Sequence, residues 1–386
     1  MNITFLSHRL SNQGGGVQSS MIGLSRALNS LTHHTAVVGV NDRQLDDTLG
    51  SWRGTRVYAS PVSGPMAFGY APDMRQSLAN ASSDIIHQHG IWTYASIAGR
   101  QVATAQATPR VITPHNMLDS VSLSISSLRK KIALSLYERL NINQSQCIHA
   151  LVDKEAVDIR QQGYKPPICV VPNGVSVPPT HGLPPHLHQL INGQPYLLYL
   201  SRLTEVKQVL VLIDAWQSCK DHPITRHWKL VIAGWGTEEM QRRVAAAVER
   251  AALKNLHFVG PVFGQDKDEL FAHADVFALP SISEGLPMAV LESLAHGTPV
   301  LITKECNLHD VEPAGAGIVV KTDFQSIRDG VQSLIERSET ERKLMRENAR
   351  ALANRSYTWM AVAAKLSSVY QWLLGGGPRP DNIDWH

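Results

Sequence analysis

The chain has 386 residues, more than one hydrophobic core comfortably serves, which favours two or three domains. Hydrophobic residues make up 43% and charged residues 18% of the sequence, as is typical of an ordinary soluble globular protein. The net charge of +3 is small and scattered, so it supports an anionic partner such as a phosphate or a lipid surface only weakly, and it does not indicate a nucleic-acid partner.

The cysteines and the N-terminal segment bear on the cellular compartment. The cysteines lie far apart in the sequence, at Cys147, Cys169, Cys219 and Cys306. Without a C-x-x-C spacing, a disulfide framework or a zinc site is not indicated, and we expect free thiols in a reducing compartment. The start of the chain lacks the long apolar core of a signal peptide, and no apolar run approaches the length that spans a bilayer. We therefore expect a cytoplasmic protein.

Short β-rich runs, each followed by a helical pattern, recur along the first half of the chain. They are predicted at residues 3–7, 35–40, 84–88, 110–113, 148–152 and 168–171. Most are apolar on consecutive residues, as expected for parallel strands that helices cover on both faces. Strands that alternate with helices predict βαβ units and a doubly wound sheet.

Three consecutive glycines follow the first predicted strand and precede a helical pattern. Glycine lets the backbone approach a ligand closely, and a helix start offers unpaired N–H groups to an anion. Gly15 and Gly16 are therefore candidate ligand contacts. The G-x-G-x-x-G dinucleotide pattern is not met, because no third glycine follows at the required spacing. A flexible turn without a ligand is the alternative interpretation.

His87 and His89 stand two residues apart at the end of a predicted strand, so their side chains share one face. No further metal-ligating residues lie nearby in the sequence. A metal site is therefore the weaker interpretation, and a hydrogen-bonded histidine pair or a contact to an acceptor substrate is favoured.

Residues 126–140, SSLRKKIALSLYERL, predict a helix with one apolar row flanked by lysines and arginines. The row consists of Leu128, Ile132, Leu136 and Leu140. Such a helix can rest on the anionic inner face of a membrane, as a peripheral contact that brings the protein to a lipid-linked substrate. A row of this kind more often packs into the domain core, so both interpretations stay open.

The second half of the chain repeats the strand–helix pattern after a connector. Residues 175–195 contain five prolines and two glycines, which predicts a stiff linker without regular structure. Further strands are predicted at residues 196–200, 229–233, 256–259, 276–279, 300–303 and 317–320. We expect an α/β protein of two Rossmann-like doubly wound domains that face each other across a cleft. Ligands of such sheets bind beyond the carboxyl ends of the strands, so the cleft is the expected site.

The expected organisation has five parts. The N-terminal domain spans residues 1–178, the linker residues 179–195 and the C-terminal domain residues 196–357. A last helix at residues 358–376 and a flexible tail at residues 377–386 complete the chain.

Arg202 and Lys207 follow the first predicted strand of the second half, in the segment SRLTEVKQ. An arginine grips phosphate oxygens with its forked guanidinium, and a lysine adds a compact charge beside it. Basic residues in surface loops are usually only solvated, but the position at a strand end favours a phosphate site.

The segment SEGLPMAVLE, residues 283–292, places two carboxylates around a predicted helix start. Its proline suits the first turn of a helix, where the missing N–H would be unpaired anyway. Gly285 and Leu286 would present backbone N–H groups to a diphosphate. Glu284 would accept hydrogen bonds from sugar hydroxyls, and Glu292 from the vicinal hydroxyls of a ribose. Two solvated acids near a helix N-terminus are the alternative interpretation.

SEGLPMAVLE resembles the E-x7-E motif of retaining glycosyltransferases of the GT-B fold, in particular glycosyltransferase family 4. SRLTEVKQ stands where that family has G-R-L-x-x-x-K-G, and GGGVQ at residues 14–18 resembles its N-terminal glycine loop. VPNGV at residues 171–175 is similar to the segment that enters the interdomain linker. HGIW at residues 89–92 and TPHNMLD at residues 113–119 resemble segments of bacterial polysaccharide glycosyltransferases. The resemblance extends across nearly the whole chain.

The resemblance implies a role for each motif residue. The implied catalytic residues are His115, Arg202, Lys207 and Glu284. The implied donor-binding residues are Gly15, Gly16, Arg202, Lys207, Glu284, Gly285, Leu286, Met288 and Glu292. The candidate acceptor contacts are His87, His89 and Asn116. The last helix is implied to cross back to the N-terminal domain.

The resemblance also implies the reaction. A retaining, metal-independent hexosyltransferase would move a sugar from a UDP- or GDP-linked donor to a saccharide or lipid-linked saccharide, in bacterial surface polysaccharide assembly. It would use no cofactor besides this donor. No protein base is obligatory if the departing phosphate takes the acceptor's proton on the same face of the sugar.

Three positions depart from the pattern of the family. Ser201 and Gln208 replace glycines around the Arg-Lys segment, and Asn116 stands where a glycine is common. These changes alter the freedom of the backbone near the phosphate but leave the charged groups intact.

Of four other functions, two stay compatible with the sequence and two are disfavoured. A nucleotide-sugar epimerase or a catalytically inactive binding scaffold would use the same fold. A glycogen-type phosphorylase would need a longer chain and a lysine for pyridoxal phosphate. A dinucleotide-dependent oxidoreductase is disfavoured, because Glu239 occupies the place of the third glycine in GWGTEE.

Overall fold

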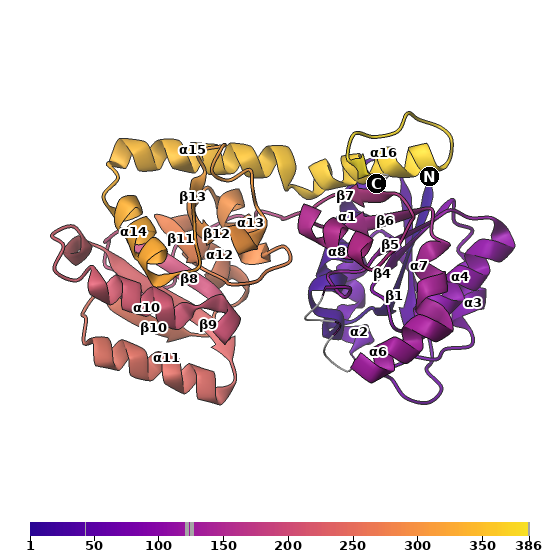
Figure 1. The fold of residues 1–386 in the computed structure, drawn as a ribbon, viewed down its shortest axis with the longest axis horizontal. Helices are drawn as coiled ribbons and strands as arrows, with labels where there is room; N and C mark the ends of the chain where they lie inside the picture. Colours follow the sequence, from indigo (N-terminus) through magenta and orange to yellow (C-terminus); the bar gives the residue numbers. More distant parts are fainter. Residues whose placement is uncertain (43, 120–122, 124–126, 385–386) are drawn as a thin grey trace. The chain divides into compact units, whose positions relative to one another are not determined.

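The computed structural model describes residues 1–42, 44–119, 123 and 127–384 (Figure 1). The chain divides into two compact units. Unit 1 comprises Met1–Gly174 and Trp359–His386, and unit 2 comprises Val175–Thr358. Each unit is a mainly parallel sheet covered by helices, which confirms the predicted α/β class. The domain limits expected from the sequence stay predictions.

The sheet of unit 1 has the strand order β14-β7-β6-β5-β4-β1-β2-β3. The strands are β1 Asn2–Arg9, β2 His34–Val40, β3 Thr55–Ser60, β4 Ile85–His89, β5 Arg110–Thr113, β6 Cys147–Ala150, β7 Ile168–Val170 and β14 Ile383–Asp384. Neighbours pair in parallel, except that β14 runs antiparallel to β7. From β1 the chain adds β2 and β3 on one side of the sheet, and from β4 onwards it adds β5, β6 and β7 on the other side. Such a change of direction leaves a crevice at the carboxyl ends of the two strands between which it occurs, here β1 and β4.

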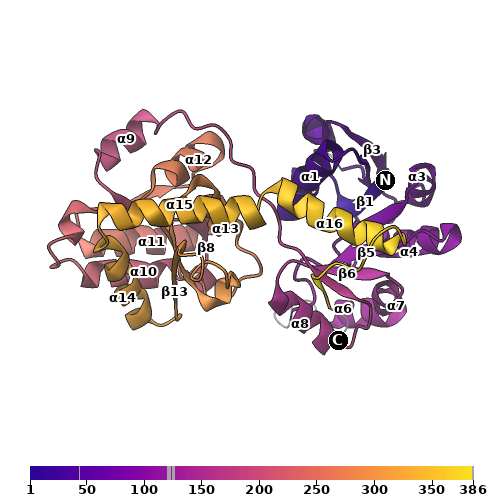
Figure 2. The ribbon, with the colours of Figure 1, turned by 90° about the horizontal axis from the view of Figure 1, so that it is seen from above.

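Helices cover both faces of the unit 1 sheet. On one face α1 (Gly15–Ser30) packs beside α16 (Trp359–Leu373), which runs over the sheet in Figure 2. On the other face lie α3 (Met74–Asn80) and α4 (Tyr94–Gln106). The remaining segments are η1 Asn12–Gly14, α2 Leu45–Thr48, η2 Leu49–Trp52, α6 Ser127–Ala133, the π-helical turn η3 Leu134–Glu138, α7 Arg139–Asn143 and α8 Asp153–Gln161.

The end of the chain, predicted as a flexible tail, carries the short strand β14. Ile383 pairs with Cys169 of β7 and is only 4% exposed, and the guanidinium of Arg379 donates a hydrogen bond to the carbonyl of Ile383. Burial of Ile383 and the backbone pairing with β7 thus hold this segment against the sheet. The expected helix before it forms as α16 and belongs to unit 1.

The sheet of unit 2 has the strand order β10-β9-β8-β11-β12-β13, with every neighbouring pair parallel. The strands are β8 Tyr196–Leu203, β9 Lys229–Gly236, β10 Leu256–Gly260, β11 Val276–Leu279, β12 Val300–Thr303 and β13 Gly317–Val320. Here the order reverses between β8 and β11. The corresponding crevice therefore lies at the carboxyl ends of these two strands.

The helices of unit 2 form two groups by their mutual contacts. The first group is α10 Val209–Ser218, α11 Glu238–Ala251 and α14 Phe324–Ile335. The second group is α12 Gly264–His273, α13 Met288–His296 and α15 Glu339–Ser356. Short 3-10 turns are η4 Glu205–Lys207, η5 Thr225–His227 and η6 Lys304–Cys306.

The proline-rich connector is more ordered than the sequence predicts. Residues 179–195 contain the helix α9 (Pro185–Ile191), whose Leu187 and Ile191 are buried in the core of unit 2. Pro185 is tolerated because it stands in the first turn of the helix, where no N–H partner is lost. The expectation of no regular structure was wrong here.

The apolar row predicted at residues 126–140 is exposed, so packing of this row into the core is wrong. The exposed fractions are 71% for Leu128, 52% for Ile132, 74% for Leu136 and 46% for Leu140. The opposite side of the same segment faces the domain, where Glu138 and Ile142 are fully buried. Residues 124–126 lie outside the described part of the chain. Among the described helices, none is both long and apolar enough to pass through a bilayer.

Candidate functional site

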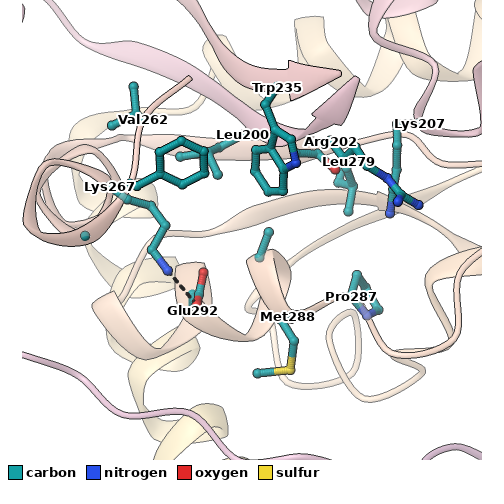
Figure 3. A pocket seen from close by; sticks show the side chains of 14 residues that line it. Leu200, Arg202, Lys207, Trp235, Val262, Lys267, Leu279, Pro287, Met288 and Glu292 are labelled. Carbon is teal, nitrogen blue, oxygen red and sulfur yellow. Dashed lines mark hydrogen bonds and ion pairs between the residues drawn. The ribbon is translucent and has the colours of Figure 1, made fainter. Parts of the chain in front are cut away.

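A cavity of about 380 Å³ lies at the carboxyl ends of β8, β9 and β11 in unit 2 (Figure 3). The starts of α12 and α13 close its other sides. The charged residues that line it are Arg202, Lys207, Lys267 and Glu292, and the aromatic ones are Trp235 and Phe263. The cavity therefore occupies the crevice that the strand order of unit 2 predicts.

Arg202 and Lys207 lie together at one end of this cavity, as Figure 3 shows. Arg202 is the next-to-last residue of β8, and its side chain is exposed. Lys207 ends the η4 turn and forms an ion pair with Glu284, whose side chain is 9% exposed. Glu284 thus contacts the cavity only through Lys207 and does not itself line it. Two cations beside one carboxylate leave a net positive end that suits an anion.

The backbone is left-handed at two of the three positions where this sequence replaces a glycine of the family pattern. Gln208 has φ of 51° and stands directly before α10, and Asn116 has φ of 60°. This region favours glycine, and asparagine tolerates it better than glutamine does. The Oε1 atom of Gln208 is also buried without a hydrogen-bond partner among the described residues. The departure at Gln208 therefore carries a local energetic cost.

The start of α13 provides backbone donors at the same cavity. The helix begins at Met288, one residue later than the proline that the sequence places in the first turn, and no side chain caps it. Pro287, Met288 and Ala289 line the cavity. The first N–H groups of a helix have no intrahelical partner, and the helix dipole favours an anion there. Gly285 and Leu286 precede this turn but do not line the cavity.

Glu292 and Lys267 form an ion pair at the other end of the cavity in Figure 3, with Nζ 2.7 Å from Oε1. Lys267 lies in α12 and Glu292 in α13, so two neighbouring helices meet through this contact. Burial raises the pKa of Glu292, while Lys267 opposes the rise. The lysine therefore favours the ionised form of the carboxylate and holds it through the ion pair.

Trp235 and Phe263 add an aromatic surface to the cavity. Trp235 is 42% and Phe263 61% exposed, and their ring centroids are 5.3 Å apart. Large aromatic side chains are rarely left exposed as a neighbouring pair without a partner. Such a pair offers a stacking surface for a planar heterocycle.

The candidate histidines of unit 1 lie next to one another, with ring centroids 4.3 Å apart for His87 and His89 and 5.3 Å apart for His89 and His115. His115 follows β5 with φ of 54°, and its Nε2 lies 3.0 Å from Nδ1 of His89. Burial lowers the pKa of His115 to about 3, so this imidazole is neutral at physiological pH. The backbone N–H of Asn116 donates to the buried Glu155 at 2.6 Å, which fixes the loop.

His87 is a core residue in the structure. It has no exposed surface, and its ring nitrogens lie 2.7 Å from Tyr370 Oη and 2.7 Å from Thr113 Oγ1. Since both nitrogens are engaged inside the protein, His87 offers no atom to an acceptor in this conformation. We therefore remove it from the candidate acceptor contacts.

Gly15 and Gly16 form the start of α1, which has no side-chain cap and no acidic residue in its first turn. Gly15 has φ of 58°, and a Cβ atom there would meet nothing within 4 Å. Glycine is therefore needed at residue 15 for its backbone conformation rather than for lack of space.

Two sequence families match the chain and together account for most of it. Residues 15–174 match "Glycosyl transferase 4-like domain", and residues 188–352 match "Glycosyl transferases group 1". The chain belongs to the GT-B glycosyltransferases.

Relatives of this glycosyltransferase are distant but cover much of its length. A human subunit of phosphatidylinositol N-acetylglucosaminyltransferase is 22% identical over 96% of this chain and 75% of that protein. The putative colanic acid biosynthesis glycosyltransferase WcaL of Salmonella typhimurium is 27% identical over 46% of each chain. Crystal structures of Alr3699/HepE from Anabaena, in complex with UDP and with UDP-glucose, have TM-scores of 0.74 and 0.71. Both share 18% identity and cover 96% of this chain and 100% of the other.

The glycosyltransferase brings part of the predicted site together around one cavity. Arg202, Lys207, Met288 and Glu292 line it. Lys267 and Trp235 also line it but were not predicted, because neither belongs to a recognised motif. Trp235 stands just after a predicted strand, and Lys267 lies near the start of the next helix, so position alone was the available signal.

Proposed function

We propose that this glycosyltransferase is a retaining, hexosyl-transferring enzyme that takes its sugar from a UDP- or GDP-linked donor. The acceptor is a saccharide or a lipid-linked saccharide, and the product serves bacterial surface polysaccharide assembly. The observation that carries the proposal is the unit 2 cavity, which combines two cations, an uncapped helix start and an exposed aromatic pair.

The parts of the cavity match the parts of a nucleotide sugar. The diphosphate lies between Arg202, Lys207 and the start of α13. The base stacks on Trp235 and Phe263, and the ribose hydroxyls donate to Glu292. The binding of UDP and UDP-glucose by the structural neighbour HepE supports this assignment.

The chemistry follows from where charge develops. The bond between the anomeric carbon and the phosphate oxygen breaks, and negative charge grows on the leaving diphosphate. Arg202, Lys207 and the helix-start N–H groups are positioned to stabilise that charge in place. The departing phosphate oxygen accepts the proton of the acceptor hydroxyl, whose oxygen bonds to the anomeric carbon on the same face. Since the protein supplies the cations, no metal and no further cofactor is needed in this proposal.

A binding and turnover experiment tests the proposal. Titration calorimetry with UDP and GDP is expected to detect one nucleotide with wild-type protein and a loss of at least tenfold in affinity with Arg202→Gln. Chelation with EDTA is expected to leave turnover unchanged. Arg243→Gln, which removes an exposed arginine paired with Glu205 outside the cavity, serves as the matched control. Wild-type nucleotide affinity in Arg202→Gln would contradict the donor site.

A second assay separates transfer from epimerisation. Labelled nucleotide sugar without an acceptor is expected to give only slow hydrolysis. Formation of an epimer under these conditions would favour the epimerase alternative.

We further propose that unit 1 rests on an anionic membrane surface through the outer row, defined as Leu128, Ile132, Leu136 and Leu140. An apolar residue at every fourth position would drift around an ideal α-helix, which has 3.6 residues per turn. The π-helical turn η3 has more residues per turn than an α-helix, so it rotates the later apolar positions back to the outer side of the segment. All four members of the row are therefore exposed. The only acid of residues 127–143 is the buried Glu138, whereas Arg129, Lys131 and Arg139 are exposed. Apolar side chains flanked by cations fit an anionic lipid surface.

A further inference from the structure

A second cavity, of about 210 Å³, lies within unit 1 at the carboxyl ends of β1 and β4. It therefore occupies the crevice where the strand order of unit 1 reverses. Its polar side chains are those of Ser7, His8, Arg9, Gln13, His89 and Thr93, and Met117 is one of its apolar members.

His89 presents an unpaired polar atom at this cavity. The residue is 4% exposed, and its Nδ1 is engaged by His115 at 3.0 Å. Its Nε2 is buried and has no hydrogen-bond partner among the described residues. A buried ring nitrogen without a partner costs free energy, so a native protein usually provides a partner for it.

The charge around this cavity is positive. Arg9, the last residue of β1, is partly exposed and lines the cavity next to the uncapped start of α1. None of the described residues that line the cavity is a carboxylate. Asp42 lies near His8 but outside the lining, and its oxygens accept hydrogen bonds from the Ser11 hydroxyl at 2.8 Å and from the Gln44 N–H at 3.1 Å. Among the described residues that line the cavity, a ligand thus meets one guanidinium and no carboxylate.

His8, which also lines the cavity, does not change this charge at neutral pH. Burial, and then the neighbouring Arg9, lower the pKa of His8. His8 and His89 are therefore neutral hydrogen-bonding groups, and Arg9 is the charged one.

We propose that this cavity binds the acceptor of the glycosyltransferase and that the acceptor carries a phosphate group beside its hydroxyls. Arg9 and the N–H groups at the start of α1 bind the phosphate, and Nε2 of His89 bonds a hydroxyl. The proposal names the acceptor class and so rests on the proposed transfer reaction. It assigns the glycine loop to the acceptor, whereas the cations of unit 2 hold the donor.

This assignment is tested with the full-length protein by comparing the binding of phosphorylated compounds with that of their unphosphorylated parents. Glucose 6-phosphate, inositol 1-phosphate and glycerol 3-phosphate are each compared with the neutral parent by titration calorimetry. We expect at least one phosphate to bind tenfold or more tightly than its parent, as one charge-assisted contact provides. Arg9→Gln removes this preference, and Arg56→Gln, which changes an exposed arginine of β3, keeps it.

Arg202→Gln shows whether the preference for phosphate arises in the donor site of unit 2. Because Arg202 does not line the unit 1 cavity, the preference for phosphate is expected to persist in this variant. Three results would overturn the proposal: no phosphate binds more tightly than its parent, the preference survives in Arg9→Gln, or it disappears in Arg202→Gln. Titration of the same samples with UDP and with GDP reports on the donor site independently. Failure of the wild-type protein to bind either nucleotide would therefore count against the proposed function and not against the acceptor cavity.

Discussion

At the scale of single residues, the ion pair between Lys267 and Glu292 determines how the donor cavity presents its carboxylate. Both side chains are about a quarter exposed, at 24% and 25%, so solvent screens the pair only in part. Burial raises the pKa of Glu292, and the charge of Lys267 is the largest effect that opposes this rise. Without the lysine, the carboxylate would be harder to ionise and free to rotate away from the cavity.

A double-mutant cycle tests this coupling. Lys267→Met and Glu292→Gln are each expected to weaken binding of the preferred nucleotide by about tenfold, because each disrupts the same ordered carboxylate. The double variant should be only slightly weaker than either single variant. Additive losses, measured by titration calorimetry, would show that the two residues act independently.

Gln208 offers a second residue-scale prediction. Its φ of 51° and its unpaired Oε1 predict that Gln208→Gly raises the free energy of unfolding by about 1 kcal/mol, after the entropic cost of glycine is included. Gln208→Val should lower it, since a β-branched residue is poorly tolerated at positive φ. Chemical denaturation of the three proteins measures the difference, and a destabilised Gln208→Gly would contradict the interpretation.

Single residues also show where a sequence stops being informative. Arg202, Lys207 and Glu292 could be predicted because their spacing around strand ends and a helix start has a chemical meaning. The pairing of Lys207 with Glu284, and of Lys267 with Glu292, could not, because each joins residues of different loops or helices that meet only in the fold. Lys207 and Glu284, for which separate roles were predicted, form one ion pair.

At the scale of elements, strands with consecutive apolar residues were predictable, whereas short edge strands were not. Each strand predicted in the second half forms in unit 2. The strand β3, TRVYAS, lies at the edge of the unit 1 sheet and was missed, because its middle residues are only partly buried. The strand β14 has two residues, too few for any periodicity. Edge strands need fewer apolar residues, so their sequence pattern is weak.

The helical segment that bears the outer row yields the element-scale prediction. Wild-type protein is expected to sediment with vesicles that contain phosphatidylglycerol and much less with vesicles of phosphatidylcholine. The double substitution Leu128→Ser and Leu136→Ser should reduce binding at least tenfold, because it removes the two most exposed apolar side chains of the row. Val157→Ser, at an apolar residue of α8 that is 53% exposed, is the matched control.

Charge reversal completes this test. Arg129→Glu and Lys131→Glu are preferred to a change at Lys130, because the ammonium of Lys130 lies 5.9 Å from the centre of the Trp92 ring. The reversed pair should weaken binding most at low salt, where surface attraction is least screened. Equal binding by wild type and both double variants would show that the row has another use.

At the scale of the whole molecule, the two units differ in how they respond to acid. His87, His89 and His149 are buried in unit 1, and His115 is partly buried beside them. Burial is the main cause that lowers their pKa, to about 3 for His115 and about 4 for His149. Their stabilising contribution is complete above the usual histidine pKa of 6.5 and is lost as pH falls from there towards the lowered values.

The size of the effect follows from the proton linkage. At pH 5.5 His115 and His149, with folded-state pKa values of about 3 and about 4, each lower the free energy of unfolding by about 1.4 kcal/mol. Glu155 acts in the opposite direction, because burial raises its pKa to about 7 and the folded state then gains stability on protonation. Because four histidines with lowered pKa values oppose this one glutamate, a net loss of stability is expected for unit 1 between pH 7.5 and pH 5.5.

Calorimetric melting at the two pH values measures this difference. In unit 2, burial also lowers the pKa of His257 and His296, but Asp268 opposes the change at His296, so the acid effect there should be smaller. The nucleotide that binds at pH 7.5 identifies the unit 2 transition, because a ligand raises the melting temperature of the unit that holds it. The transition that the nucleotide does not shift should fall further at pH 5.5. If the nucleotide-shifted transition fell by as much, the buried histidines would not be the cause of the acid sensitivity.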